Sequence, residues 1–590
     1  MSDPTLPTKI SRRAVLVALT AGGAGMLLAA CGGAVAPTSS APASSPAGSP
    51  APSVNAAPAP NSSAVASAAP SASASAGAGI SAASHDKASQ AGFLPFGPDK
   101  SSPDPVTAPK GQPKAGGTLR LGNLGDLPNL DGHFINGQNF LYAIWDRLVE
   151  LDASLTPHPA LAESWDVNPD YTQVTLHLKK GVTFHNGQEL TSADVVWNYT
   201  RLKTDKKVDG GVKANFLLPM SSVEAPDKYT AVIKASHPWP NVFSVLAWCN
   251  ILNQSAFTAN PNKPVGTGPF SFVEWVQGDH ITMKKNPQYW KTGKPYVDQM
   301  VVQIFKDPQS MLAQLQGEAI DVAILPALRD AVALAKDSKY QVGYNQTSGS
   351  VNVIATQNAQ GAGPTTIKTF RQALAYSMDR PRWADIYTTG TGTPKDLPIT
   401  PTNPAYSASK DQFYTFDLAK AKSLVQQAGV SAPNLEVLYA STDPNYANVL
   451  QIWQQDLKTI GVTLNLRPAD PVSYIQELFS GRYPNLAGGA SLFGQLQPAF
   501  FAGNAYFAAA HNWANFASAQ LTQVTNAIAT TTDPSTQKQA YAEWVAYILD
   551  QAWVLPWSNT VPRIAATAKV QGMAYNMTEF FMPNDIWLAG

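Results

Sequence analysis

The chain has 590 residues, of which 44% are hydrophobic and 14% are charged. Lysine plus arginine equals aspartate plus glutamate, at 41 each, so the formal net charge is zero. This balance argues against nucleic acid as the main partner, because neutralising phosphates demands a basic face. The length is sufficient for two or three domains.

An apolar run from Ala14 to Ala30 follows Arg12 and Arg13. It is short for a bilayer-spanning helix, which needs about 20 predominantly apolar residues, and its glycines weaken it further. The run is therefore predicted to be the core of a signal peptide over residues 1–31, with the two arginines as its positive region. The alternative is an uncleaved membrane helix with a chance cysteine at its end.

Two short motifs in this region indicate export and lipidation. Ser11 to Leu16 resembles the twin-arginine export motif, which a receptor reads as an address, although the general secretory route stays open. The ending "LAAC" resembles a lipobox, in which cleavage precedes Cys31 and its thiol is lipidated. The other cysteine, Cys249, would then have no disulfide partner and is predicted to be a small buried residue.

Residues 32–114 are predicted to be a disordered tether. From Gly32 to Ser84 the chain is almost entirely Ala, Ser, Pro, Gly and Thr, without a charged residue. Such a segment cannot bury enough apolar surface to offset chain entropy. Treated as a flexible coil of about 80 residues, it has a root-mean-square span of roughly 50 Å. A tether of that reach would hold a folded domain clear of a membrane.

The first part of the globular region contains strand patterns. Alternation in "VTLHL" (174–178) predicts a half-buried strand that ends in a turn at Gly181. Thr191 and Asp194 have the spacing of a capping box, with Val195 and further apolar residues at helical spacing behind it. The region 115–300 is therefore predicted to mix strands with helices and to be rich in strands.

The second part alternates helices and strands. An apolar stripe at 367–374 predicts a helix that Pro381 ends, and a further helix is predicted from Asp417 to Gly429. Strands are predicted at 435–439 and 462–466, with the helix "YANVLQIWQQDLKTIG" between them. The order strand, helix, strand implies a parallel crossover and an α/β fold class.

Five stretches resemble the family 5 extracellular solute-binding proteins, the receptors of ABC importers for peptides, nickel and some oligosaccharides. They are "GGTLRLG" (116–122), "LTPHPALAESWDV…TSADVVWNY" (155–199), "VGTGPFSFVEW" (265–275), "NPQYW" (286–290) and "FRQALAYSMDR" (370–380). The resemblance implies a two-lobed periplasmic-binding-protein-like fold of the large, three-subdomain type. It implies a discontinuous first lobe at 115–304 plus 556–590 and a second lobe at 305–555, with the return crossing at Leu555 and Pro556.

The resemblance also implies a function and partners. The expected role is that of a monomeric, lipid-anchored receptor on the outer face of the cytoplasmic membrane, which captures an oligopeptide-like solute and delivers it to permease subunits. A receptor for an oligosaccharide or another neutral solute is the alternative. A tethered adhesin or scaffold is less well supported, because the sequence shows no internal repeats.

Catalytic and metal-binding motifs are absent from the sequence. It contains no H-E-x-x-H, C-x-x-C or P-loop motif, and "GGASLFG" lacks the last glycine of a nucleophile elbow. "VGTGPF" is predicted to form a tight turn at Gly266 and Gly268. The eight histidines have no metal-ligand spacing. The expectation is a protein that is not an enzyme and that has neither a metal nor a cofactor.

The predicted solute contacts lie mostly within residues 488–507. Where peptide receptors of the family hold the ligand's α-amino group with an aspartate, the resemblance places Gln495 and Gln497, which would suit a ligand without a free amine. Surface positions for both glutamines are the alternative. Further candidates are the aromatic residues Phe493, Phe500 and Trp513, which could equally form core, and Asn358, which falls where the family has an asparagine near the cleft.

Overall fold

The computed structural model describes most of the chain beyond residue 108. The ranges described are 109–590 except 128, 134–139, 153–154, 206–207, 209–216, 218, 325, 345–349, 442, 492–493, 495–496, 503–505, 510–511, 560–562, 576–580 and 590. The signal peptide with Arg12, Arg13 and Cys31, and the tether as far as 108, lie outside these ranges and stay predictions. Within them, no helix is both long and apolar enough to cross a bilayer.

The first lobe contains a seven-stranded mixed sheet. Its order is β12 (Tyr340–Tyr344), β18 (Arg563–Thr567), β11 (Val322–Ile324), β1 (Thr118–Leu124), β10 (Gln299–Phe305), β9 (His280–Lys285) and β8 (Phe270–Val276). Alternate side chains of these strands enter two apolar clusters, so the sheet is covered on both faces. Helices α6 (Pro308–Gln316) and α7 (Leu328–Leu334) supply residues to the smaller cluster.

A second subdomain of the first lobe is built on a four-stranded antiparallel sheet. Its order is β4 (Ala162–Val167), β5 (Gln173–Leu178), β7 (Thr230–Ala235) and β6 (Met220–Asp227). The first lobe also contains three two-stranded sheets, which are β2 (Val149–Leu151) with β3 (Pro157–Pro159), β19 (Val570–Gln571) with β22 (Trp587–Leu588), and β20 (Ala574–Tyr575) with β21 (Phe581–Met582). Its remaining helices are η2 (Leu141–Ala143), α2 (Ser192–Thr204), α4 (Val242–Trp248) and α5 (Gln254–Ala259). The four-stranded sheet has a hydrophobic core of its own.

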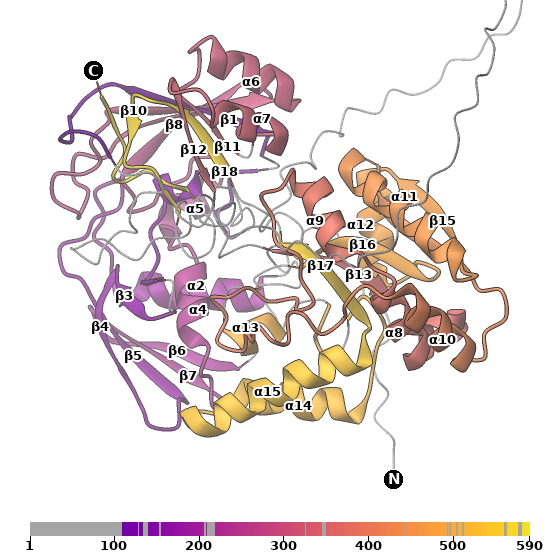
Figure 1. The fold of residues 1–590 in the computed structure, drawn as a ribbon. Coiled ribbons are helices and arrows are strands. Elements are labelled where there is room, and N and C mark those ends of the chain that lie inside the picture. Colours follow the sequence, from indigo (N-terminus) through magenta and orange to yellow (C-terminus); the bar gives the residue numbers. More distant parts are fainter. Residues whose placement is uncertain are drawn as a thin grey trace, which may run out of the picture.

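The second lobe is an α/β layer on a five-stranded sheet. Its order is β15 (Thr463–Ala469), β14 (Asn434–Ala440), β16 (Leu486–Ser491), β13 (Val351–Thr356) and β17 (Val554–Asn559). Its helices are η3 (Gly363–Thr366), α8 (Lys368–Tyr376), α9 (Arg380–Thr388), α10 (Leu418–Gln427), α11 (Pro444–Thr459), α12 (Pro471–Ser480), α13 (Pro498–Ala502), α14 (Ala519–Thr530) and α15 (Pro534–Gln551). Figure 1 shows this lobe, coloured from red-brown through orange to yellow, beside the indigo and magenta elements of the first lobe. The three sheets confirm the three-subdomain architecture.

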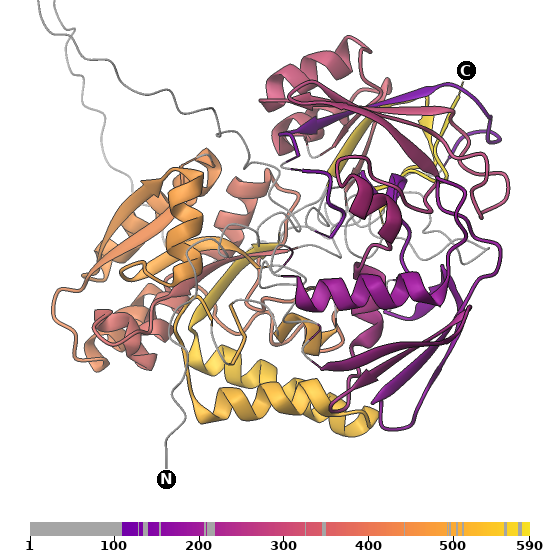
Figure 2. The same ribbon diagram turned by 180° about the vertical axis from the view of Figure 1, so that it is seen from behind.

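Two antiparallel strand pairs face each other across the junction of the lobes. The chain leaves the first lobe after β12 and enters the second at β13, and it returns from β17 to β18. β12 pairs with β18 in one sheet, and β13 pairs with β17 in the other. In Figures 1 and 2 the α14–α15 hairpin extends from the second lobe toward the four-stranded sheet. The chain thus passes between the lobes twice, once after β12 and once after β17.

The lobe boundaries differ from the expected ones. Because β11 and β12 belong to the first lobe's sheet, the second lobe begins after residue 344 and not after 304. The return crossing at Leu555 and Pro556 falls inside β17, a strand of the second lobe, so the chain crosses a few residues later. Both lobes alternate helices and strands here, and that local pattern does not reveal which sheet a strand joins.

Local signals in the sequence agree with the helix starts. The backbone and side chain of Thr191 both donate to Asp194 Oδ2, at 2.9 and 3.0 Å, which confirms the predicted capping box of α2. Asp417 caps α10 by accepting from the Lys420 amide at 2.8 Å. Pro381, however, does not end a helix. It lies in the first turn of α9, where its missing N–H leaves no hydrogen bond unmade.

Candidate functional site

A loop of the second lobe supports the segment 488–507, in which most solute contacts are predicted. The carbonyl of Gly494 accepts from the Thr400 amide at 3.1 Å and from Asn403 Nδ2 at 3.0 Å. The same loop lies against the returning strand β17, because the Thr393 amide donates to Asn559 Oδ1 at 2.7 Å and Pro394 bridges to Ser558. The loop therefore links this segment to the strand that leads back to the first lobe.

Helix α13 joins the two lobes through one aromatic side chain. Phe500 belongs to the second lobe, yet it is fully buried in the core of the four-stranded subdomain. Its ring centroid lies 6.5 Å from that of Trp248, at the end of α4. A phenylalanine in this position stabilises the contact between the lobes, and separating the lobes would expose it.

The first lobe presents a buried arginine in the same core region. Arg147, just before β2, is fully buried, and its guanidinium carbon lies 3.0 Å from the centroid of the Tyr142 ring. Nη1 donates to the Trp145 carbonyl at 2.8 Å, whereas Nε and Nη2 have no hydrogen-bond partner. Burial lowers the pKa of this guanidinium because the charged form loses its hydration. Unpaired donors on a buried charged group are unusual and need an explanation.

A second unpartnered donor lies at the junction end of the second lobe. Asn352 is the second residue of β13, is buried, and leaves its Nδ2 without an acceptor. In the sheet it lies opposite Ala490 of β16 and Ser558 of β17. Arg147 and Asn352 are two of the buried side chains whose polar atoms lack a hydrogen-bond partner; Asn358 Oδ1 and Tyr199 Oη are others.

Comparison with known proteins identifies the family. Residues 156–512, more than half of the chain, match the model for "Bacterial extracellular solute-binding proteins, family 5 Middle". The chain belongs to this family. The family is one of solute-binding receptors and not of enzymes, and among the described residues no group of three or more His, Cys, Asp or Glu side chains could hold a metal ion.

Relatives of this family 5 protein are named for different ligands. It is 30% identical over 365 residues to the heme-binding protein A of Haemophilus influenzae, a match that covers 56% of this chain and 64% of that protein, or less than two thirds of its length. It is 25% identical to the oligopeptide-binding protein AppA of Bacillus subtilis, over 64% of this chain and 74% of the relative. The solved structure of AgaA from A. tumefaciens R10, in complex with agropinic acid, is 26% identical with a TM-score of 0.70, covering 80% of this chain and 99% of AgaA.

Of the predicted site residues that the structure describes, Asn358 lies beside Trp513, because the Asn358 amide donates to the Ala514 carbonyl at 2.8 Å. Asn358 donates through Nδ2 to the Thr356 carbonyl at 2.6 Å, and Gln497 Oε1 accepts from the Tyr541 hydroxyl at 3.4 Å. Trp513 packs on Phe479, with ring centroids 4.2 Å apart, so all three make contacts inside the second lobe. Phe500 enters the opposite core, and Phe493 and Gln495 lie outside the described residues.

Sequence reasoning missed Arg147 and Asn352. Arg147 stands in "AIWDRLVEL", where apolar residues flank it closely on both sides, and an arginine in such a run is a signal of a buried charge. Asn352 stands in "SVNVIAT", which has the pattern of a buried strand interrupted by one amide. Neither pattern says what the side chain would bind.

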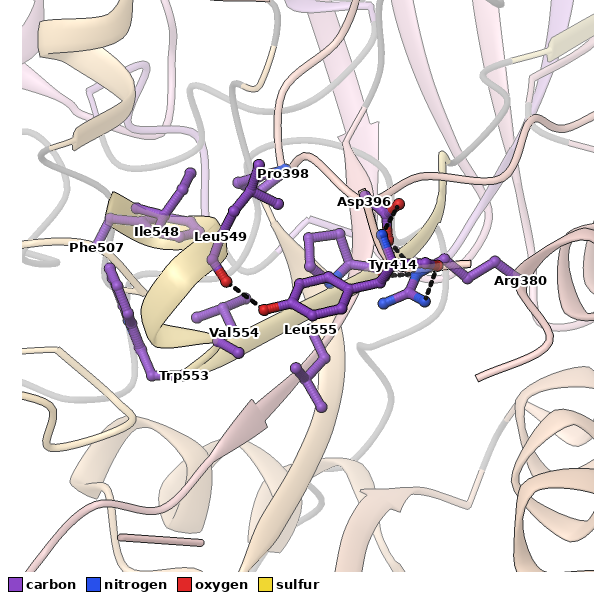
Figure 3. Close-up of a pocket in the computed structure, with 12 residues that line it drawn as sticks. Arg380, Asp396, Pro398, Tyr414, Phe507, Ile548, Leu549, Trp553, Val554 and Leu555 are labelled. Atoms are coloured by element: carbon purple, nitrogen blue, oxygen red, sulfur yellow. Dashed lines mark hydrogen bonds and ion pairs between the residues drawn. The ribbon is translucent and has the colours of Figure 1, made fainter. Parts of the chain in front are cut away.

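A pocket inside the second lobe is a weaker candidate. Its cavity volume is about 10 Å³, roughly the space of one water molecule, and it lies between the end of α15 and the loop at Asp396 (Figure 3). Its polar groups are already engaged: the Tyr414 hydroxyl donates to the Leu549 carbonyl, and the Tyr414 amide donates to Asp396 at 2.9 Å. Arg380 lies 2.9 Å from Asp396, whose pKa burial raises. Because every lining residue belongs to the second lobe, closure of the lobes would not enclose this space.

Proposed function

We propose that the chain is the substrate-binding receptor of an ABC importer and encloses a peptide-like solute between its lobes. The observation that carries the proposal is the division of the strands between two lobes: β12 pairs with β18 in one sheet and β13 pairs with β17 in the other, so the chain passes between the lobes twice. Closure of two such lobes around a ligand is a known mode of domain motion in binding proteins. Contacts to both lobes exist only in the closed form, so solute binding favours that form. Membership of the family supports a receptor, and so do relatives that are named for heme or oligopeptide binding or solved with agropinic acid, but their ligands differ and do not fix the solute of this chain.

The solute is proposed to lack a free amine. No Asp or Glu occurs between Glu477 and Asp533, so the segment 488–507 offers no carboxylate to a buried ammonium. Burying an unpaired ammonium costs several kcal/mol, equivalent to a factor of a hundred or more in affinity. N-blocked peptides therefore bind more tightly than the same peptides with free amines, and oligosaccharides remain the second solute class to test.

The proposal is tested by calorimetry and scattering on the purified protein. N-acetylated tripeptides, free tripeptides and neutral oligosaccharides are titrated separately, and the radius of gyration is measured with and without the best binder. We expect binding of the N-acetylated set and a smaller radius in its presence. Submicromolar binding of ordinary free-amine peptides would contradict the absence of an amine, and binding of none of the three sets would contradict the peptide-like solute.

The receptor is further proposed to be anchored to the membrane through lipid on Cys31. Cys31→Ala removes the thioether site, so the protein is expected in the medium or as an uncleaved precursor. Fractionation followed by immunoblotting with an antibody to the folded part measures this. Cys249→Ala is the matched control, because Cys249 is buried in the fold and should not affect fractionation. A mature-sized Cys31→Ala protein in the membrane fraction would contradict the anchor.

A further inference from the structure

Two exposed phenylalanines lie close together in the loop that precedes α10. Phe413 and Phe416 are each 42% exposed. The other exposed large apolar side chains of the described ranges are aliphatic, namely Val273, Val276 and Ile367. Phenylalanine is usually buried, so a pair of exposed rings in one loop is a surface feature that needs an explanation.

Buried contacts hold the loop that carries these rings. Asp411 pairs with Lys395 at 2.7 Å, and both side chains are buried. The Tyr414 hydroxyl donates to the Leu549 carbonyl, and the Tyr414 ring packs edge-on against that of Phe413, with centroids 4.9 Å apart. The two phenylalanines therefore project from a loop that is already in place, and burying them in an apolar layer would not require the loop to become ordered first.

Two lysines flank the aromatic side chains. Lys410 Nζ lies 5.8 Å from the centroid of the Phe413 ring. Lys420 Nζ lies 3.9 Å from the centroid of the Tyr376 ring and donates to the Tyr376 hydroxyl at 2.6 Å. Tyr376 in turn packs edge-on against Tyr414, with centroids 4.9 Å apart. The rings of Phe413, Tyr414 and Tyr376 thus form a chain of contacts with a positive charge at each end.

The surface of this loop and of the start of α10 is positive, although the whole chain is neutral. Residues 410–422 expose three lysines and one aspartate, Asp417. The Asp417 carboxylate is engaged, because it accepts from the Lys420 amide at 2.8 Å as the cap of α10. Within the part of the chain that the structure describes, neither Lys410 nor Lys420 lies in an ion pair. Their charge is therefore available to an external anion.

We propose that this aromatic–lysine face rests on the surface of an anionic lipid bilayer; the face consists of Tyr376, Lys410, Phe413, Phe416 and Lys420. Phenylalanine rings are stabilised at the boundary between headgroups and acyl chains, and lysines beside them attract the lipid phosphates. A protein partner fits less well, because two half-exposed rings and two lysines are a smaller patch than the roughly 1,000 Å² of a stable protein interface. The contact goes beyond the proposed receptor function and requires neither solute nor lipid on the chain.

The position of the face is compatible with movement of the lobes. Tyr376 ends α8, and Lys420 lies in the first turn of α10. Figures 1 and 2 show these two helices side by side, on the side of the second lobe that lies away from the first lobe. Contact of these helices with a bilayer leaves the first lobe free to move, and the predicted tether, with a span of roughly 50 Å, is long enough to allow the contact.

Vesicle sedimentation tests the face with the full chain carrying Cys31→Ala, so that no attached lipid contributes. Binding is compared for vesicles of phosphatidylcholine alone and for vesicles that also contain phosphatidylglycerol. We expect tighter binding to the anionic vesicles, and Phe413→Ser with Phe416→Ser should weaken it about tenfold. Lys410→Gln with Lys420→Gln should also weaken it roughly tenfold and should remove most of its dependence on salt.

Val273→Ser with Val276→Ser is the matched control, because these side chains are 48% and 43% exposed but lie on β8 of the first lobe. This variant should bind both kinds of vesicle as the parent chain does. The signal peptide is common to all variants, so its own affinity for lipid cancels in the comparison. Equal binding by the parent chain and the phenylalanine variant, or no binding of the parent chain to anionic vesicles, would overturn the inference. Solute binding by the same variants tests the receptor function separately.

Hydrogen exchange on the Cys31→Ala chain requires no change in the face itself. Anionic vesicles should slow amide exchange in residues 410–422 and leave exchange in β8 unaffected. Unchanged exchange in 410–422 would contradict the bilayer contact, and so would phenylalanine substitutions that alter self-association of the protein without altering vesicle binding. Because the attraction is sensitive to salt, washing membranes with concentrated salt removes it and keeps the fractionation test of Cys31 interpretable.

Discussion

Gly266→Ala should lower the free energy of unfolding by about 3 kcal/mol or more, the upper range for an overpacked core. A Cβ atom at Gly266 would lie 2.0 Å from the Ile144 carbonyl oxygen and 2.6 Å from Cδ1 of Trp145. The first of these is backbone and Trp145 is buried, so neither can move away at low cost. Urea unfolding monitored by tryptophan fluorescence measures the change.

Gly278→Ala is the matched control for this effect. Gly278 has φ +76° and nothing within 4 Å of the added Cβ, so the substitution tests backbone strain without a clash. It should cost about 1–2 kcal/mol, the price of a left-handed conformation for a residue with a Cβ. Equal losses in the two variants would show that the close approach at Gly266 is not what requires glycine.

The two glycines of "VGTGPF" illustrate what a sequence can and cannot predict. Their presence predicts a tight turn, but the structure gives a different reason for them: the Gly268 amide donates to the Ile144 carbonyl at 3.0 Å, and the backbone of Ile144 passes too close for any side chain. This contact joins residues more than a hundred positions apart. Local pattern cannot reveal it, because composition and turn propensity carry no information on which distant segment approaches.

Elements fixed by local chemistry were predictable. The capping box of α2, the Asp417 cap of α10 and the parallel strands β14 and β15 depend on residues a few positions apart or on one helical crossover. The lobe boundary was not predictable in this way, since joining β11 and β12 to the first sheet depends on long-range pairing with β1 and β18. Local propensity determines whether a segment forms a helix or a strand, and long-range strand pairing determines which sheet a strand joins.

The candidate site was less predictable than the fold. Aromatic residues such as Phe500 and Trp513 have the same chemistry whether they contact a solute or pack in a core, and here both pack against protein. Arg147 becomes a candidate only once its hydrogen bonds can be counted, because an arginine in an apolar run could equally have donated to carbonyls, as Arg380 does. Arg147 is distinguished by its lack of hydrogen-bond partners and not by its residue type.

The buried pair Lys395–Asp411 should be the most sensitive ion pair of the second lobe. Lys395 Nζ lies 2.7 Å from Asp411 Oδ2, and both side chains are less than a tenth exposed. Asp411 also accepts from the amides of Asp396 and Leu397, each at 2.9 Å, and so holds the loop that carries Thr400 to Gly494. Asp411→Ala leaves a buried ammonium and two buried amides without partners. We expect a loss of about 3–5 kcal/mol in the free energy of unfolding, measured by urea titration.

Asp550→Ala is the matched control for this pair, because it breaks a lysine–aspartate contact of the same length at the surface. Lys368 Nζ lies 2.7 Å from Asp550, but the two side chains are 44% and 48% exposed. Water and salt replace the lost partner there, so the change should stay within about 1 kcal/mol. The double variant Lys395→Met with Asp411→Leu removes both charges and should recover part of the loss of Asp411→Ala. If the double variant is no more stable than Asp411→Ala, the loss comes from the freed amides of the loop and not from the unpaired ammonium of Lys395.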